Sequence, residues 1–348
     1  MELSKSKKTY IASVIIFILA VVSYYNKYYG NSGEKPVPYQ KCSGVVWTTQ
    51  YHITYQSEKL FDDSIQAVFD AVNDCASMFN KNSLVSRINR NEETLVDSMF
   101  VKLYEASMFV NKETNGAFDP TVSPLMKIWG FVEKTGETPS VNKIDSIRNF
   151  VGINKTSLTI DNQIIKQDSR LEFDFSAIAK GLGCDEVGRM LERNGVENYL
   201  VEIGGEIALK GVNPNGLEWC VSVDSPTEQY KEGLEMNDGL VILRLTSGGV
   251  ATSGNYRNYK VIDGKKVVHT MNPLNGYPEE NDLLSATIVA KNCMLADAYA
   301  TACMVMGFER SKEFLENKSD LGAFLVYVEE GDSLLVWSND RFKQMSSF

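Results

Sequence analysis

Histidine and paired cysteines are scarce in this sequence of 348 residues. It contains two histidines, His52 and His269, and none of its six cysteines stands in a CxxC pair. Zinc sites and dithiol redox centres need clustered thiolates or imidazoles, so both are disfavoured. The sequence also lacks a GxSxG motif, which disfavours a Ser-His-Asp hydrolase.

Clusters of basic residues are absent beyond the N-terminal segment. The formal net charge is -10 and the isoelectric point is about 5.0. A nucleic-acid surface needs clustered lysines and arginines to neutralise phosphates. We therefore expect proteins or small molecules as partners, and no nucleic acid. The hydrophobic share of 43% and the charged share of 23% are those of a globular chain.

The N-terminus combines positive charge with an apolar run. Lys5, Lys7 and Lys8 precede the apolar residues 11–22, and four tyrosines follow within residues 24–29. This order is typical of a signal peptide or a membrane anchor over residues 1–30. The run is shorter than the roughly 20 apolar residues of a full span, and no small-x-small cleavage site follows it. We favour an uncleaved anchor, and the positive-inside rule places the body outside the cytoplasm.

The rest of the chain is predicted to be a polar linker, residues 31–41, and one folded body, residues 42–348. Apolar residues recur at helical spacing between residues 65 and 79, and residues 99–113 form a second predicted helix. Strands are predicted at residues 45–55, 171–175, 199–203, 219–223, 241–245, 285–290 and 323–328, and further helices at residues 178–193 and 295–306.

Two short segments read as hairpin turns, Asp161-Asn162 and Asp263-Gly264, because asparagine and glycine tolerate left-handed backbone conformations. Hairpins and helices are mixed without a regular alternation of strand and helix. The pattern therefore predicts an α+β fold rather than a doubly wound sheet.

The predicted helix 295–306 contains one carboxylate and one hydroxyl, Asp297 and Thr301, in an otherwise small and apolar stretch. Four residues are about one helical turn, so both side chains project from the same face. Carboxylate and hydroxyl oxygens suit a hard cation such as Mg²⁺. The alternative is structural: an aspartate favourable to the helix dipole and a threonine bonded to a backbone carbonyl.

Residues 174–183 run from a predicted strand into a helix start, with Ser176 as the expected cap. Free backbone donors and the positive end of the helix dipole would attract an anion, and Lys180 adds a mobile positive charge. The spacing matches neither a Walker motif nor a dinucleotide fingerprint. The alternative is a plain capped helix with a surface lysine.

Four glycine-containing turns follow, at residues 202–206, 247–249, 252–257 and 269–278. Glycine lets the backbone approach a ligand closely, although each turn could be only a connector. His269 lies in the last of them, among glycine, asparagine and proline. A lone histidine is more often structural, but its position in a polar loop favours contact with a ligand.

Six segments occur in an order that is highly specific. They are residues 116–125 with Trp129-Gly130, residues 174–181, Gly204-Gly205-Glu206, residues 253–257, residues 269–278 and residues 297–301. Together they resemble the ApbE family of FAD:protein FMN transferases, from about residue 42 to the C-terminus. The resemblance implies a two-lobed body of sheet and helix, and a reaction in which FAD is split at its diphosphate, FMN passes to a Thr or Ser hydroxyl of another protein, and AMP leaves.

The resemblance also implies roles for single residues. Mg²⁺ would be held by Asp297, Thr301 and the backbone carbonyl of Ala177. His269 would lie against the diphosphate, and Phe79 on the flavin side. Contacts to FAD are implied for Ala117, Phe118, Asp119, Asp174, Lys180 and Met271, and catalytic roles for Asp297, His269 and Lys180.

One segment departs from the family pattern. Residues 46–49 read Val-Trp-Thr-Thr where the family usually has Thr-Met-Gly-Thr. Trp47 could stack on the flavin or could simply fill the core.

For the mechanism, we expect Mg²⁺ to bridge the diphosphate while an acceptor hydroxyl attacks the FMN phosphorus, with Asp297 available as a weak base. An FAD pyrophosphatase and an FAD-binding protein without turnover need the same pocket and remain open. The family's acceptors include subunits of sodium-pumping NADH:quinone oxidoreductases. We expect this chain at a bacterial inner membrane, with its body on the periplasmic side.

Overall fold

The structure is a computed structural model, and it describes Val21 and residues 36–132, 138–223, 241–254, 259–262, 265–329 and 333–347. Apart from Val21, the predicted signal or anchor lies outside these residues, as do residues 255–258 of one glycine turn. No helix within the described residues has the length and apolar character needed to cross a bilayer. The chain divides into Met1–Pro38 and Tyr39–Phe348, and the fold below is that of the second unit.

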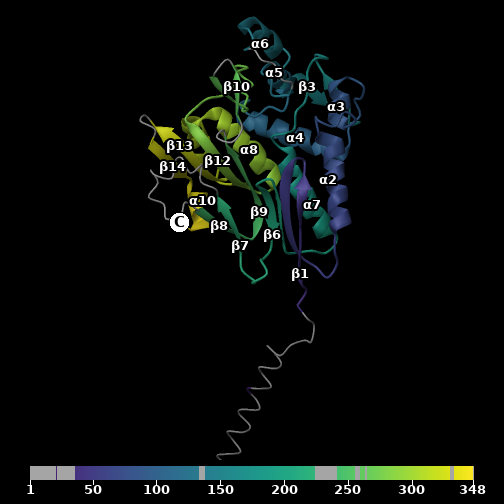
Figure 1. The fold of residues 1–348 in the computed structure, drawn as a ribbon, viewed down its shortest axis with the longest axis vertical. Coiled ribbons are helices and arrows are strands. Elements are labelled where there is room, and N and C mark those ends of the chain that lie inside the picture. Colours follow the sequence, from purple (N-terminus) through teal and green to yellow (C-terminus); the bar gives the residue numbers. More distant parts are fainter. Residues whose placement is uncertain are drawn as a thin grey trace, which may run out of the picture. The chain divides into compact units, whose positions relative to one another are not determined.

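An antiparallel sheet of eight strands forms the centre of the body, in the order β1-β2-β5-β6-β9-β12-β13-β14 (Figure 1). In β5, Tyr199, Val201 and Ile203 are buried and alternate with Leu200 and Glu202, as the pleat of a strand requires. The strands of this sheet are β1 (Tyr39–Val46), β2 (Thr49–Gln56), β5 (Tyr199–Ile203), β6 (Glu206–Lys210), β9 (Ser247–Gly254), β12 (Leu283–Ala290), β13 (Gly322–Glu329) and β14 (Ser333–Ser338).

The two faces of this sheet are covered by different elements. On one face lies a three-stranded sheet, made of β7 (Trp219–Val223), β8 (Val241–Leu245) and β15 (Ser346–Ser347), which shares an apolar cluster with Val250 and Val289. Neighbouring residues of the same strands, Ala251 and Ile288, belong to the cluster on the other face. There α8 (Cys293–Met306) packs on β9 and β12, and α7 (Ala179–Arg193) packs on β5 and β6.

The remaining helices are α2 (Asp62–Ala76), α3 (Leu84–Asn89), α4 (Ser98–Glu113), α5 (Ser123–Ile128), α6 (Val141–Arg148), α9 (Phe308–Glu316), α10 (Asp340–Met345) and the 3₁₀ helix η1 (Ile153–Lys155). Among them, α2 packs on α7, and α4 and α9 pack on α8, as Figure 1 shows for α2 and α4, whereas α10 packs on β8, β13 and β15. Two hairpins complete the body, β3 (Thr156–Leu158) with β4 (Ile164–Lys166) and β10 (Tyr259–Ile262) with β11 (Lys265–Val268).

The α+β class is confirmed, and so are most predicted helices and strands. The turn at Asp161-Asn162 is also confirmed, with Asn162 at a φ of 55°. The body is one compact unit rather than the two lobes that the resemblance implied. Its first strand begins at Tyr39, inside the predicted linker.

The single strand predicted for residues 45–55 is wrong, because the chain reverses within it. Val46 pairs with Thr49, and Trp47 and Thr48 form the turn with φ values of 49° and 66°. Two consecutive positive φ values are those of a type I′ turn, which usually contains glycine or asparagine. Neither residue type is present at positions 47 and 48, so the usual turn residues did not indicate this hairpin.

The strand predicted for residues 171–175 is also wrong. Leu171, Phe173 and Phe175 are fully buried, so the alternation of apolar residues is real. The backbone, however, is held by other partners: Asn89 bonds both to the N–H and to the carbonyl of Phe173 through its amide group. A buried extended segment needs its backbone groups satisfied, and here a side chain replaces a neighbouring strand.

Candidate active site

A cavity of about 620 Å³ opens beside the first turns of α7 and along α8. The sheet contributes Ser253 of β9 and Glu206 of β6 to its wall, and loops contribute residues 117–120 and 269–271. The cavity therefore gathers parts of all six sequence segments that carry the family resemblance. Residues distant in sequence meet here because α7 and α8 cross at the centre of the body.

The crossing of α7 and α8 depends on two glycines. A Cβ atom on Gly181 would lie 2.5 Å from the carbonyl oxygen of Cys293, and one on Gly249 would lie 2.1 Å from its amide nitrogen. Real Cβ atoms do not come so close to backbone atoms. Glycine is therefore required at both positions for the N-terminus of α8 to sit against α7 and β9.

The two helices cap each other. Oδ2 of Asp297 on α8 accepts a hydrogen bond of 3.1 Å from the Gly181 N–H in the first turn of α7. In return, the carboxylate of Asp185 on α7 accepts hydrogen bonds from the N–H groups of Cys293 (2.9 Å) and Met294 (3.0 Å) at the start of α8. Each cap satisfies donors that a helix start leaves without partners. The same bonds fix Asp297 in place relative to α7.

The predicted cap Ser176 does not have this role. It is exposed, and α7 begins only at Ala179, after a cap residue, Ile178, whose side chain makes no hydrogen bond to the helix. We expected an anionic ligand at the start of α7, but Asp297 of α8 lies there instead.

Three residues with different kinds of oxygen atom line the cavity near this cap. Asp297 is 3% exposed, and Thr301, one turn further along α8, has its hydroxyl 3.3 Å from that of Ser253. In a regular helix the Gly181 N–H would bond to the carbonyl of Ala177, but it donates to Asp297 instead. Asp297, Thr301 and Ala177 all line the cavity. One carboxylate, one hydroxyl and one backbone carbonyl are a set of ligands that a hard cation such as Mg²⁺ takes.

Lys180 extends from α7 into the cavity and forms an ion pair with Glu206 of β6. Burial alone would lower the pKa of Lys180, but the negative charges of Asp297 and Glu206 outweigh it and hold that pKa above its ordinary value. The lysine is therefore charged. Burial raises the pKa values of both Asp297 and Glu206, while the lysine charge acts against the increase.

Carboxylates outnumber cationic side chains in this cavity. Among the described residues of its wall, five are aspartate or glutamate, Lys180 is the one lysine or arginine, and His269 is half-buried. Nowhere in the described part of the chain do three or more Asp, Glu, His or Cys side chains form a group that could hold a metal by themselves. A metal here would need hydroxyl and carbonyl oxygens as well.

Two of the predicted FAD contacts, Asp119 and Asp174, have structural partners. Asp119 accepts hydrogen bonds from the backbone and hydroxyl of Thr121, from Asn111 and from the N–H of Ile153. These bonds join the loop after α4 to the 3₁₀ helix η1. Burial raises the pKa of Asp119 despite these donors. Oδ1 of Asp174 accepts a hydrogen bond of 2.8 Å from the Ser176 N–H. Both residues line the cavity while shaping its loops.

Of the other predicted FAD contacts, some line the cavity and some do not. Ala117, Phe118, His269 and Met271 line the cavity together with the residues above. Two predicted flavin contacts are not part of that wall.

Trp47 packs edge-to-face on Phe69, with ring centroids 5.6 Å apart, and its ring lies over Gly183. It belongs with the apolar cluster between α2, α7 and the sheet. Phe79 follows α2 and is 86% exposed, so its ring is available to a ligand or another protein.

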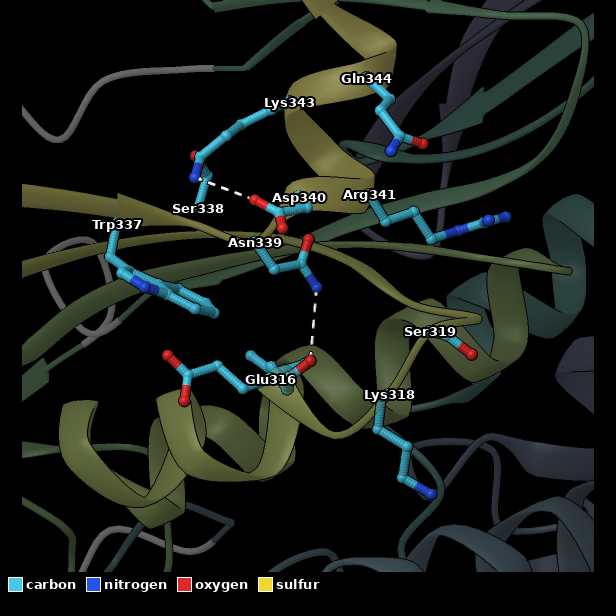
Figure 2. A pocket seen from close by; sticks show the side chains of 11 residues that line it. Glu316, Lys318, Ser319, Trp337, Ser338, Asn339, Asp340, Arg341, Lys343 and Gln344 are labelled. Atoms are coloured by element: carbon cyan, nitrogen blue, oxygen red, sulfur yellow. Dashed lines mark hydrogen bonds and ion pairs between the residues drawn. The ribbon is translucent and has the colours of Figure 1, made fainter.

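A second hollow, of about 410 Å³, lies between α9, β14 and α10 (Figure 2). Asp340 and Lys343 pair across one side of it at 3.3 Å, and the Asn339 amide group bonds to the carbonyl oxygens of Leu315 and Leu321. None of the six segments contributes to its wall. The cavity beside α7 and α8 is therefore the candidate active site.

Comparison with known proteins agrees with this geometry. The ApbE family matches residues 47–325, and the chain belongs to this family. The FAD:protein FMN transferase of Vibrio cholerae is 34% identical over 326 residues, which are 90% of this chain and 95% of that protein. The corresponding protein of Haemophilus influenzae is 33% identical over 321 residues, which are 87% of this chain and 90% of that protein.

Solved structures show the same fold. The flavin transferase ApbE from Vibrio cholerae has a TM-score of 0.77 at 31% identity and covers 89% of this chain and 100% of that one. The apo form of the Pseudomonas stutzeri flavinyl transferase ApbE has a TM-score of 0.78 at 28% identity, with 88% and 96% covered.

Sequence reasoning missed Glu206 as a site residue, although it stood in a quoted motif. The sequence alone could show only part of the pattern that marks Glu206. Glu206 is buried and so is Ala208, which shares its strand face, whereas Ile207 between them is more exposed. A charged residue on the buried face of a strand marks a site, but the phase of β6 is known only from the structure.

Proposed function

We propose that this chain is an FAD:protein FMN transferase that uses Mg²⁺, attaches FMN to a Thr or Ser hydroxyl of an acceptor protein and releases AMP. Family membership and the names of its relatives support the transferase activity. The observation that carries the proposal for this chain is that Asp297, Thr301, Ala177 and Lys180 line one cavity, with Asp297 bonded to the first turn of α7.

The charge of the cavity supports the metal. The substrate FAD has an anionic diphosphate, and the described wall presents five carboxylates against one lysine. Anions repel each other strongly in a partly buried site, so this diphosphate would not bind without additional positive charge. Asp297, Thr301 and Ala177 would hold a Mg²⁺ ion, which would supply that charge and Lewis acidity towards the phosphoryl oxygens.

The chain's own residues then have distinct tasks. Lys180, held by Glu206, places a fixed positive charge where charge develops on the diphosphate. His269 lies in the same wall and is available to hydrogen-bond a phosphate oxygen. The acceptor hydroxyl attacks the FMN phosphorus, the P–O bond to AMP breaks, and AMP leaves. In a loose transition state the hydroxyl proton is lost late, so Asp297 is needed only as a weak base, if at all.

Water in place of the acceptor hydroxyl would make the same site an FAD pyrophosphatase, and the absence of turnover would make it an FAD-binding protein. The names of the relatives favour the transferase over both.

For the cell, we propose an inner-membrane protein whose N-terminal segment is a signal or anchor and whose body faces the periplasm. The basic and apolar order of residues 5–22 supports this location. Acceptors would be extracytoplasmic redox subunits with a Thr or Ser flavinylation motif, such as those of sodium-pumping NADH:quinone oxidoreductases.

The test is an incubation of the full-length protein in detergent with FAD, Mg²⁺ and such an acceptor subunit. A fluorescent acceptor whose intact mass has increased by one FMN, together with AMP, is the expected result. Free FMN with AMP would indicate the pyrophosphatase, and intact bound FAD would indicate the binding protein. An acceptor with its Thr or Ser changed to Ala is the control.

A further inference from the structure

Glu206 is a buried carboxylate whose two oxygens differ in their surroundings. It is the first residue of β6, directly after the Gly204-Gly205 turn, and it is 4% exposed. Oε1 forms the ion pair with Lys180. Oε2 is buried and has no hydrogen-bond partner in the structure. A buried carboxylate oxygen without a partner is costly, and a native site usually supplies a cation or a donor for it.

The charges around Glu206 indicate which of these is missing. Glu206 and Asp297 are both buried in the wall of the cavity and interact electrostatically. Lys180 can neutralise one of them. The Asp297 carboxylate also accepts the Gly181 N–H, but that bond brings no net charge. Two carboxylates with one ammonium leave an excess negative charge, which a cation balances better than a neutral donor does.

We infer that Glu206 is the second carboxylate of the cation site, with Oε1 holding the Lys180 ammonium and Oε2 facing the metal ion or one of its bound waters. This inference deepens the proposed function and rests on it for the identity of the cation. Mg²⁺ commonly keeps several waters and takes only one or two carboxylates, so Asp297 and Glu206 complete a normal set.

A different role would leave Glu206 outside the cation site. In that case it would act only as a positioning residue that keeps the flexible side chain of Lys180 in the cavity. The two roles predict different effects of Glu206→Gln once Lys180 has been removed. If Glu206 faces the cation, its charge still contributes to metal binding without the ammonium. If Glu206 serves only Lys180, it has no side chain left to position, and its replacement then changes metal binding little.

The experiment measures Mn²⁺ binding to the full-length protein in detergent, by electron paramagnetic resonance of free Mn²⁺, without FAD. Glu206→Gln keeps the shape of the side chain and removes its charge, and we expect a Kd raised at least about tenfold. Lys180→Gln should lower the Kd, and adding Glu206→Gln to that variant should raise the Kd again at least about tenfold. A Kd for Glu206→Gln within about twofold of wild type, or a Kd for the double variant within about twofold of that for Lys180→Gln, overturns the inference.

Glu186→Gln is the matched control. Glu186 is also buried and ion-paired, since Oε1 accepts from Lys102 at 2.7 Å and from Arg189 at 2.9 Å, but it does not line the cavity. Its substitution should leave the Kd for Mn²⁺ within about twofold of wild type, and an effect as large as that of Glu206→Gln also contradicts the inference. Circular dichroism of each variant shows whether it is folded. If Glu206→Gln does not fold by itself, the comparison of Lys180→Gln with the double variant still decides.

FMN transfer is measured on the same preparations with FAD and the acceptor. If wild type transfers FMN normally and Glu206→Gln binds Mn²⁺ as wild type does, the proposed function stands and the inference about Glu206 is wrong. If Glu206→Gln binds Mn²⁺ more weakly but wild type transfers no FMN, the inference stands and the proposed function is wrong.

Discussion

The carboxylate that caps α8 should make the protein less stable as the pH rises. Asp185 is 7% exposed, and burial raises its pKa from 3.8 to about 6, against the lowering effect of the Met294 and Cys293 N–H groups. Between these pH values the folded chain keeps a proton that the unfolded chain has released. The free energy of unfolding therefore falls as the pH rises through this window. Each pH unit is worth about 1.4 kcal/mol, which gives a total of about 3 kcal/mol.

Asp185→Asn isolates this contribution to the pH dependence. The variant has no titratable group at position 185, and all its other titratable groups are those of wild type. Its amide keeps one acceptor oxygen but turns an NH₂ group towards an N–H, so we expect it to be less stable than wild type at acid pH by about 1–3 kcal/mol. Urea unfolding of both proteins from about pH 4 to about pH 7.5 should show this difference shrinking by about 3 kcal/mol as the pH rises. A difference constant to within about 0.5 kcal/mol would refute the reasoning.

Three other substitutions, one of them with a control, test the site. Gly181→Ala should cost about 1–3 kcal/mol of stability and weaken Mn²⁺ binding, because its Cβ meets the backbone of α8. In the control Gly183→Ala the new Cβ meets side chains and no backbone, namely the Trp47 ring at 2.5 Å and Ile203 at 3.5 Å, so Mn²⁺ binding should be unchanged. Equal losses of metal binding by the two variants in thermal-shift titrations would contradict this account. Phe79→Ala should change stability by less than about 0.5 kcal/mol, since the ring is exposed, but raise the KM for FAD or for the acceptor in transfer assays. Asp297→Asn should lower FMN transfer at limiting Mg²⁺ at least about tenfold, and full activity there would exclude Asp297 as a ligand.

Local patterns predicted those parts of the fold and site that depend on neighbours in sequence. The helical spacing of Asp297 and Thr301 placed both side chains on one face, and both line the cavity. The asparagine at position 162 predicted its hairpin because a positive φ was required there. Where the backbone took a positive φ without glycine or asparagine, at Trp47 and Thr48, the same rule failed.

The features that could not be predicted from the sequence depend on contacts between distant segments. Phe173 alternates with buried neighbours as a strand residue does, but the Asn89 side chain takes the place of a second strand. The start of α7 read as an anion site because its N–H groups looked free, and the structure gives one of them to Asp297 of α8.

That exchange explains how the proposed metal site and a helix cap can share one residue, Asp297. A carboxylate that both caps α7 and faces the cavity is held rigidly before any ligand binds, since the Asp185 cap and the glycines at 181 and 249 fix α8 from the other side. Rigid ligands lose little entropy when a cation binds, and they favour one geometry over others. Because the cation site is built from the helix crossing itself, a change that shifts α8 relative to α7 should lower stability and metal affinity together, whereas a change at the exposed rim should separate the two.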